Sequence, residues 1–74
     1  MVLQLSQETD ELTRIAERIQ RELRGRVRGF RLDAEEQGLI LHGETRTYHE
    51  KQLVQHAVLR TAALPIAANA ITVG

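Results

Sequence analysis

A chain of 74 residues without cysteine has room for one small domain, and neither a disulfide nor a thiolate metal site can strengthen its core. Hydrophobic residues make up 42% and charged residues 27%, which argues against a disordered chain. The formal net charge is zero, but residues 14–31 hold seven arginines against two glutamates, so this segment carries +5 and the remainder −5. We therefore expect one globular domain with a strongly basic region.

The N-terminal residues show no targeting or membrane-spanning pattern. Residues 1–5 lack the basic start and the small-residue cleavage site of a signal peptide. No apolar run approaches the ~20 residues that a membrane-spanning helix needs. We expect a flexible segment over residues 1–7 followed by one domain over residues 8–74, cytoplasmic as it stands, or periplasmic or membrane-associated if it is part of a larger protein.

The first predicted element is a helix over residues 7–24. Its apolar positions fall in one stripe at about 100° per residue: Leu12, Ile15, Ala16, Ile19 and Leu23. Ser6 or Thr9 is expected to cap its start, and Gly25 to end it. On the side away from the stripe the spacing predicts a basic ridge, which we define as Arg14, Arg18 and Arg21.

Two strands are predicted to follow as a hairpin. From Val27 the period falls to two, with Phe30 and Leu32 on one face, and residues 34–38 form a polar loop ending in glycine. The second strand covers residues 39–46. Gly43 inside it indicates a bulge or a close approach by another element, and we expect that element to be the second helix.

The second helix and a final strand complete the predicted fold. Thr47 and Glu50 form a capping box, and Pro65 is expected to end the helix near residue 63. Its predicted core face contains Leu53, Val54, Ala57, Val58, Thr61 and Leu64. Residues 66–73 supply a strand parallel to the second one through a right-handed crossover. The prediction is an α+β fold, α-β-β-α-β, with a three-stranded mixed sheet and two helices packed on one face.

The motifs of the second half resemble those of the BON domain, a bacterial module named for osmotic-shock and nodulation proteins. Residues 39–43, Leu-Ile-Leu-His-Gly, match its V-x-L-x-G strand, and residues 69–73, Asn-Ala-Ile-Thr-Val, match its N-x-L/I-x-V strand. The turn at residues 64–66 lacks the family's glycine after Pro65, and the stretch between Ile66 and Asn69 is shortened. The resemblance covers residues 8–73 and implies a non-enzymatic binding module linked to phospholipid membranes and envelope stress.

The residues available for catalysis or metal binding are few. There is no cysteine, and the one serine, Ser6, precedes the predicted core. His49 and His56 lie seven residues apart on one helix, so their Cα atoms are about 10 Å apart, too far to share a zinc ion easily. His42 lies on a strand and is expected to share a face with Glu44. We therefore expect no enzymatic activity, no metal site and no cofactor.

The arginine-rich segment is the candidate binding face, and it has two interpretations. Six residues define it: Arg14, Arg18, Arg21, Arg24, Arg26 and Arg28. They are expected to bind the phosphates of anionic phospholipid or an acidic, envelope-associated protein partner. The alternative is a solvated strand edge whose arginines pair with Glu17, Glu22 or Glu44.

We consider two other functions besides docking to an anionic surface. One is protein–protein interaction or self-association through an exposed strand edge or the off-core Leu59 and Tyr48. The other, nucleic-acid binding, is less favoured, because Phe30 and Tyr48 are the only aromatic residues and three residues separate Gly25 from Gly29, where a KH-type G-x-x-G loop has two.

Overall fold

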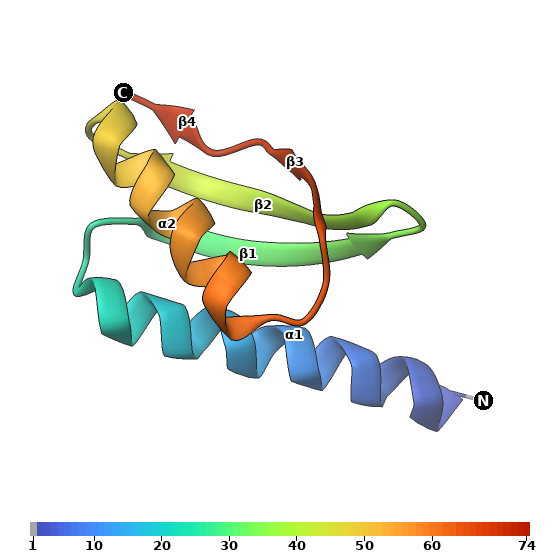
Figure 1. The fold of residues 1–74 in the computed structure, drawn as a ribbon. Helices are drawn as coiled ribbons and strands as arrows, with labels where there is room; N and C mark the ends of the chain where they lie inside the picture. The colour runs from blue at the N-terminus through green and yellow to red at the C-terminus, as the bar shows by residue number, and fades with distance from the viewer. Residues whose placement is uncertain (1) are drawn as a thin grey trace.

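The computed structural model describes the backbone of residues 2–74 and the side chains of residues 10–74. Its elements are α1 (Val2–Leu23), β1 (Arg28–Glu35), β2 (Gly38–Thr45), α2 (Tyr48–Thr61), β3 (Ile66–Asn69) and β4 (Thr72–Val73). The strands form one mixed sheet, with β1 antiparallel to β2, and β3 and β4 both parallel to β2. Both helices pack on one face of this sheet (Figure 1). The predicted α+β fold with the order α-β-β-α-β is confirmed.

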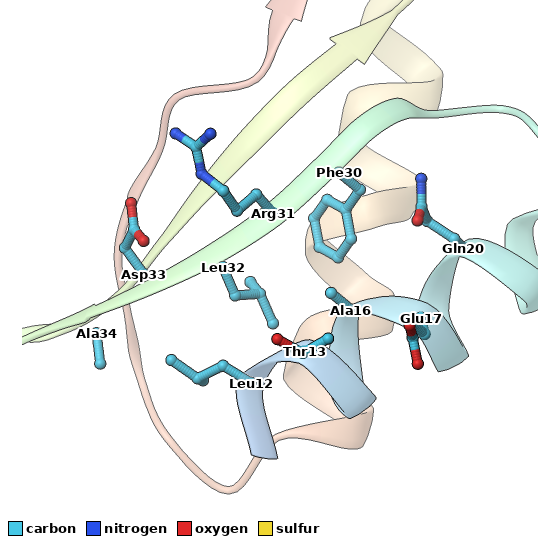
Figure 2. Close-up of a pocket in the computed structure, with 10 residues that line it drawn as sticks. All are labelled: Leu12, Thr13, Ala16, Glu17, Gln20, Phe30, Arg31, Leu32, Asp33 and Ala34. Atoms are coloured by element: carbon cyan, nitrogen blue, oxygen red, sulfur yellow. The ribbon is translucent and has the colours of Figure 1, made fainter. Parts of the chain in front are cut away.

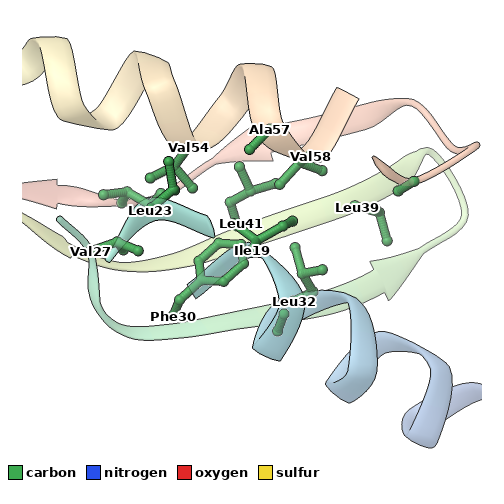
Figure 3. Packing of buried hydrophobic residues seen from close by; sticks show 13 residues of the cluster. Ile19, Leu23, Val27, Phe30, Leu32, Leu39, Leu41, Val54, Ala57 and Val58 are labelled. Carbon is green, nitrogen blue, oxygen red and sulfur yellow. The ribbon is translucent and has the colours of Figure 1, made fainter. Parts of the chain in front are cut away.

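The core lies between the two helices and the sheet. It contains the predicted stripe of α1, with Ile19 fully buried and Leu12 and Ile15 packed at its margin. From the sheet it takes alternate residues, Phe30 and Leu32 of β1 and Leu39 and Leu41 of β2, as the two-residue period predicts (Figure 3). The opposite face of the sheet carries no helix in the described part of the chain.

Helix α1 begins earlier than its sequence suggests. Its backbone is helical from Val2 rather than from residue 7, and it ends at Leu23, one residue before the predicted end. The predicted caps Ser6 and Thr9 and the predicted flexible segment 1–7 fall on residues whose side chains lie outside the described ones.

The predicted last strand is divided into two. Between β3 and β4, the Ala70 amide donates to the Leu41 carbonyl (2.9 Å) and the Ile71 amide donates to Asn69 Oδ1 (3.2 Å). This local turn directs Ile71 into the core, where it is 2% exposed. The turn interrupts the predicted strand, so the sheet has four strands instead of three.

Gly43 has a different neighbour from the one expected. The register between β1 and β2 shifts between Arg28 and Arg31, and Gly29 has a positive φ of 61°, so Gly29 and Phe30 together lie opposite Gly43 in a β-bulge. A Cβ at Gly43 would lie 3.1 Å from the Arg28 carbonyl oxygen and 3.1 Å from a Val27 methyl carbon. Gly43 was expected at a bulge or a close approach; it lies opposite a bulge whose extra residue belongs to β1, and β1, not α2, makes the close approach.

The predicted capping box at the start of α2 is formed. The Glu50 amide donates to Thr47 Oγ1 (3.1 Å), and the Glu50 carboxylate accepts from the Arg46 amide (3.0 Å) rather than from that of Thr47. At the other end α2 stops at Thr61, two residues before the predicted end, with Ala62 extended. Leu64, predicted on the core face, lies beyond the helix and is exposed.

Replacing Thr47 with alanine is expected to lower the free energy of unfolding by about 1 kcal/mol, because the Glu50 amide loses its acceptor. Urea denaturation followed by circular dichroism measures this change. Thr47→Ser keeps the hydroxyl and is the matched control, expected to unfold at nearly the wild-type midpoint. A Thr47→Ala midpoint equal to that of wild type would show that water replaces the cap without loss.

Candidate basic surface

Four arginines meet around one hollow at the end of α1. The hollow has a volume of about 240 Å³, and its lining includes Arg24, Arg26 and Arg28 together with Arg46 from the β2–α2 connection. We call these four residues and the space between them the basic hollow. Three of them belong to the predicted binding face, and the structure adds Arg46.

The path of the chain after α1 explains why these side chains point outward. Arg24 and Gly25 adopt left-handed conformations with φ of 49° and 80°, and the Arg26 amide then donates to the Leu23 carbonyl (3.2 Å). Val27 is buried at 3% exposure and anchors the loop to the core. The arginines on either side of this anchor are exposed.

The hollow carries acidic groups as well. Glu44 and Glu50 also line it, and Glu44 lies opposite Arg28 in the β1–β2 register. One Glu50 oxygen accepts the Arg46 amide in the capping box. Four arginines against two glutamates leave the lining with a formal charge of +2, at the N-terminal, partially positive end of α2.

The basic ridge occupies a separate part of the surface. Arg14, Arg18 and Arg21 are exposed on α1, as predicted, but the basic hollow includes none of them. Arg18 instead lines a shallow depression with Glu22 and with Arg60 of α2. The structure thus divides the six predicted residues into a ridge along α1 and a hollow at its end.

The alternative interpretation, in which glutamates pair with the six arginines of the candidate binding face, is not supported by ion pairs among residues 10–74. Within residues 10–74 the ion pairs join Arg60 Nη2 to Glu22 Oε2 (2.6 Å) and His42 Nε2 to Asp33 Oδ2 (2.9 Å). Glu22, one of the partners considered in that alternative, pairs with Arg60 instead. The Arg60–Glu22 pair is solvent-exposed and His42 is only half-buried, so each pair contributes little to stability.

The histidines do not converge. His42 contacts Asp33 across the strands rather than Glu44, while His49 and His56 are exposed on α2. Among the residues the structure describes, no three histidine, cysteine or acidic side chains lie close enough together to hold a metal ion.

A second hollow, not predicted from the sequence, lies between α1 and the outer edge of β1. This groove has a volume of about 560 Å³ and combines apolar and polar lining (Figure 2). Its walls are Leu12, Thr13, Ala16, Glu17 and Gln20 of α1 and residues 30–34 of β1. The residues proposed for protein–protein contact, Tyr48 and Leu59, lie elsewhere and are 65% and 51% exposed.

Neither helix, over the residues described, has the length and apolar content required to cross a bilayer. No family model, curated protein or solved structure matches this chain.

Proposed function

We propose that this domain is a BON-like, non-enzymatic binding module that docks on anionic phospholipid surfaces through the basic hollow, with the basic ridge as a flanking contact. The observation that supports the proposal best is the convergence of Arg24, Arg26, Arg28 and Arg46 from two separate connections. Guanidinium groups pair well with phosphate oxygens, since each presents several donors in a fixed plane.

The size and charge of the basic hollow suit a headgroup phosphate. Water occupies about 30 Å³ per molecule in the liquid, so a hollow of about 240 Å³ accommodates a phosphate with part of its hydration shell. The N-terminal end of α2 adds a favourable field for an anion. Because Glu44 and Glu50 oppose this charge, the expected docking is weak and relies on several arginines acting together.

The affinity is expected to be electrostatic and salt-sensitive. A basic residue near an anionic membrane contributes about 1 kcal/mol, and the interaction decays within the Debye length of about 10 Å at 0.1 M salt. In the residues described, both helices use their apolar stripes for the core, so the proposal involves surface adhesion without insertion.

Removing two charges from the basic hollow is expected to weaken vesicle binding by about 30-fold, which corresponds to about 2 kcal/mol. The variant is Arg24→Gly with Arg26→Gln. Glycine suits the left-handed φ of 49° at residue 24, and Arg26 is exposed, so the fold should be retained. Co-sedimentation with phosphatidylcholine vesicles, with and without phosphatidylglycerol, at low and high salt measures the effect.

Arg60→Gln is the control for position, because it removes one exposed arginine outside the basic hollow. Its binding to anionic vesicles should stay within about twofold of wild type. Equal binding of wild-type protein to neutral and anionic vesicles would contradict the proposal, as would equal loss in the control. Displacement from vesicles by a small excess of single-stranded RNA would favour the nucleic-acid alternative instead.

A further inference from the structure

The outer edge of β1 presents backbone groups without a partner strand in the described part of the chain. Strand β1 is at one end of the sheet and pairs only with β2. On β2, the Leu39 amide donates to the Pro65 carbonyl and the Leu41 carbonyl accepts from the Ala70 amide, so these backbone groups face β3. Their register partners Ala34 and Leu32 therefore direct their own amide and carbonyl groups outward, because pairing alternates along an antiparallel ladder.

The groove beside this edge has room for the side chains of an added strand. Phe30 and Leu32 point from β1 toward α1, where Leu12 and Ala16 form the facing apolar wall (Figure 2). An added strand would place alternate side chains into this space of about 560 Å³. Apolar residues suit those positions.

The other face of the added strand would meet charges of both signs. Arg31 and Asp33 are exposed on the open face of the sheet, on either side of Leu32, where Asp33 also contacts His42 of β2 (2.9 Å). An antiparallel strand fits best with an acidic residue opposite Arg31 and a basic residue opposite Asp33. We propose that the β1 edge binds an extended segment of another protein as an additional antiparallel strand, with the pattern apolar, basic, apolar, acidic, apolar.

A peptide segment fits this edge better than a second folded copy does. Residues 30–34 of β1 themselves read apolar, basic, apolar, acidic, apolar, so two copies would have matching charges. However, α1 packs beside β1 in each copy, so a two-fold axis at Leu32 would bring the two α1 helices toward each other across the seam. An extended peptide has no helix that would approach α1 at this edge. The opposite edge of the sheet is less suitable, because it consists of β3 and β4, four and two residues long with a break between them.

The test uses two capped, fluorescent peptides with the same composition. One has the core valine-lysine-valine-glutamate-valine, and the other has the two charges exchanged. Wild-type protein is expected to bind the first about tenfold more tightly, as measured by fluorescence anisotropy. The double variant Arg31→Glu with Asp33→Arg should reverse this preference. Both side chains are exposed, so circular dichroism should show an unchanged fold.

A second pair of variants tests the backbone contact. Ala34→Pro removes an outward amide, and proline is tolerated on an edge strand, so binding of both peptides should fall at least tenfold while the fold is kept. Ala34→Thr retains the amide, so its affinity for the peptides should fall far less than that of Ala34→Pro. Amide chemical shifts on peptide addition should change most at Leu32 and Ala34.

Equal affinity for the two peptides, no binding at about 1 mM protein, or shifts centred on Ile66–Asn69 would overturn the proposal. A wild-type dimer in sedimentation velocity that is lost in Ala34→Pro would assign the edge to a second copy and would also overturn it. None of the substituted residues lines the basic hollow, so failure here is distinguishable from failure of vesicle binding.

Discussion

Replacing Gly38 with alanine is expected to lower the free energy of unfolding by at least about 3 kcal/mol. Gly38 has a φ of 137°, and a Cβ there would lie 2.4 Å from the Pro65 carbonyl oxygen. That oxygen accepts the Leu39 amide at 2.9 Å, so moving Pro65 away would break the junction between β2 and β3. A chain of this length has a total stability of about 4 to 11 kcal/mol, so the loss is a large part of it.

Gly29→Ala is the matched control for this prediction. Gly29 also has a positive φ, 61°, but a Cβ there would meet nothing within 4 Å. Its expected cost is therefore only the left-handed backbone term of about 1 kcal/mol. Chemical denaturation of both variants separates the two causes. Equal losses would show that backbone conformation alone, and not contact with Pro65, makes glycine necessary at residue 38.

Truncating Leu41 to alanine is expected to cost about 3 to 4 kcal/mol. Leu41 is fully buried in the middle of β2, between the two helices and the sheet (Figure 3). The loss combines the transfer of the removed methyl groups with the cavity left behind, since neighbours on three elements cannot all close on it. Equilibrium urea unfolding measures the change, with thermal unfolding as a second readout.

Leu59→Ala removes the same atoms from an exposed site and is the control for Leu41. Leu59 is 51% exposed on α2, so its truncation should change stability by no more than about 0.5 kcal/mol. A loss at Leu59 close to that at Leu41 would mean that Leu59 is covered in solution. That result would revive the interpretation of Leu59 as a protein–protein contact.

The two surfaces that we propose for binding lie on different parts of the molecule. The basic hollow is formed where α1 leads into β1 and β2 leads into α2, whereas the groove follows residues 12–20 of α1 and 30–34 of β1. The first presents guanidinium groups and the second presents backbone groups. A module with both would be able to contact an anionic surface and an extended protein segment at the same time.

Local patterns predicted the elements well. The apolar stripe of α1, the two-residue period of β1 and the capping box of Thr47 and Glu50 all depend on residues within a few positions of one another. Each of these signals acts through short-range geometry, which is the same in any fold. The order of elements then followed directly from the order of these signals along the chain.

The sequence by itself therefore determined the element order, the core face of each helix and the presence of a basic region. Tertiary structure decided which of those elements meet. The bulge at Gly29 shifted the register by one residue, so β1 rather than α2 approaches Gly43, and the turn at Asn69 split the last strand to bury Ile71.

The candidate sites also depend on which elements meet in the folded chain. Arg46 joins Arg24, Arg26 and Arg28 only because the β hairpin returns the chain to the end of α1, and no local pattern marks that meeting. The contact between His42 and Asp33 and the groove between α1 and β1 likewise depend on how separate elements pack together. Periodicity reports which side of an element is buried, whereas register and packing angle decide which exposed side chains become neighbours.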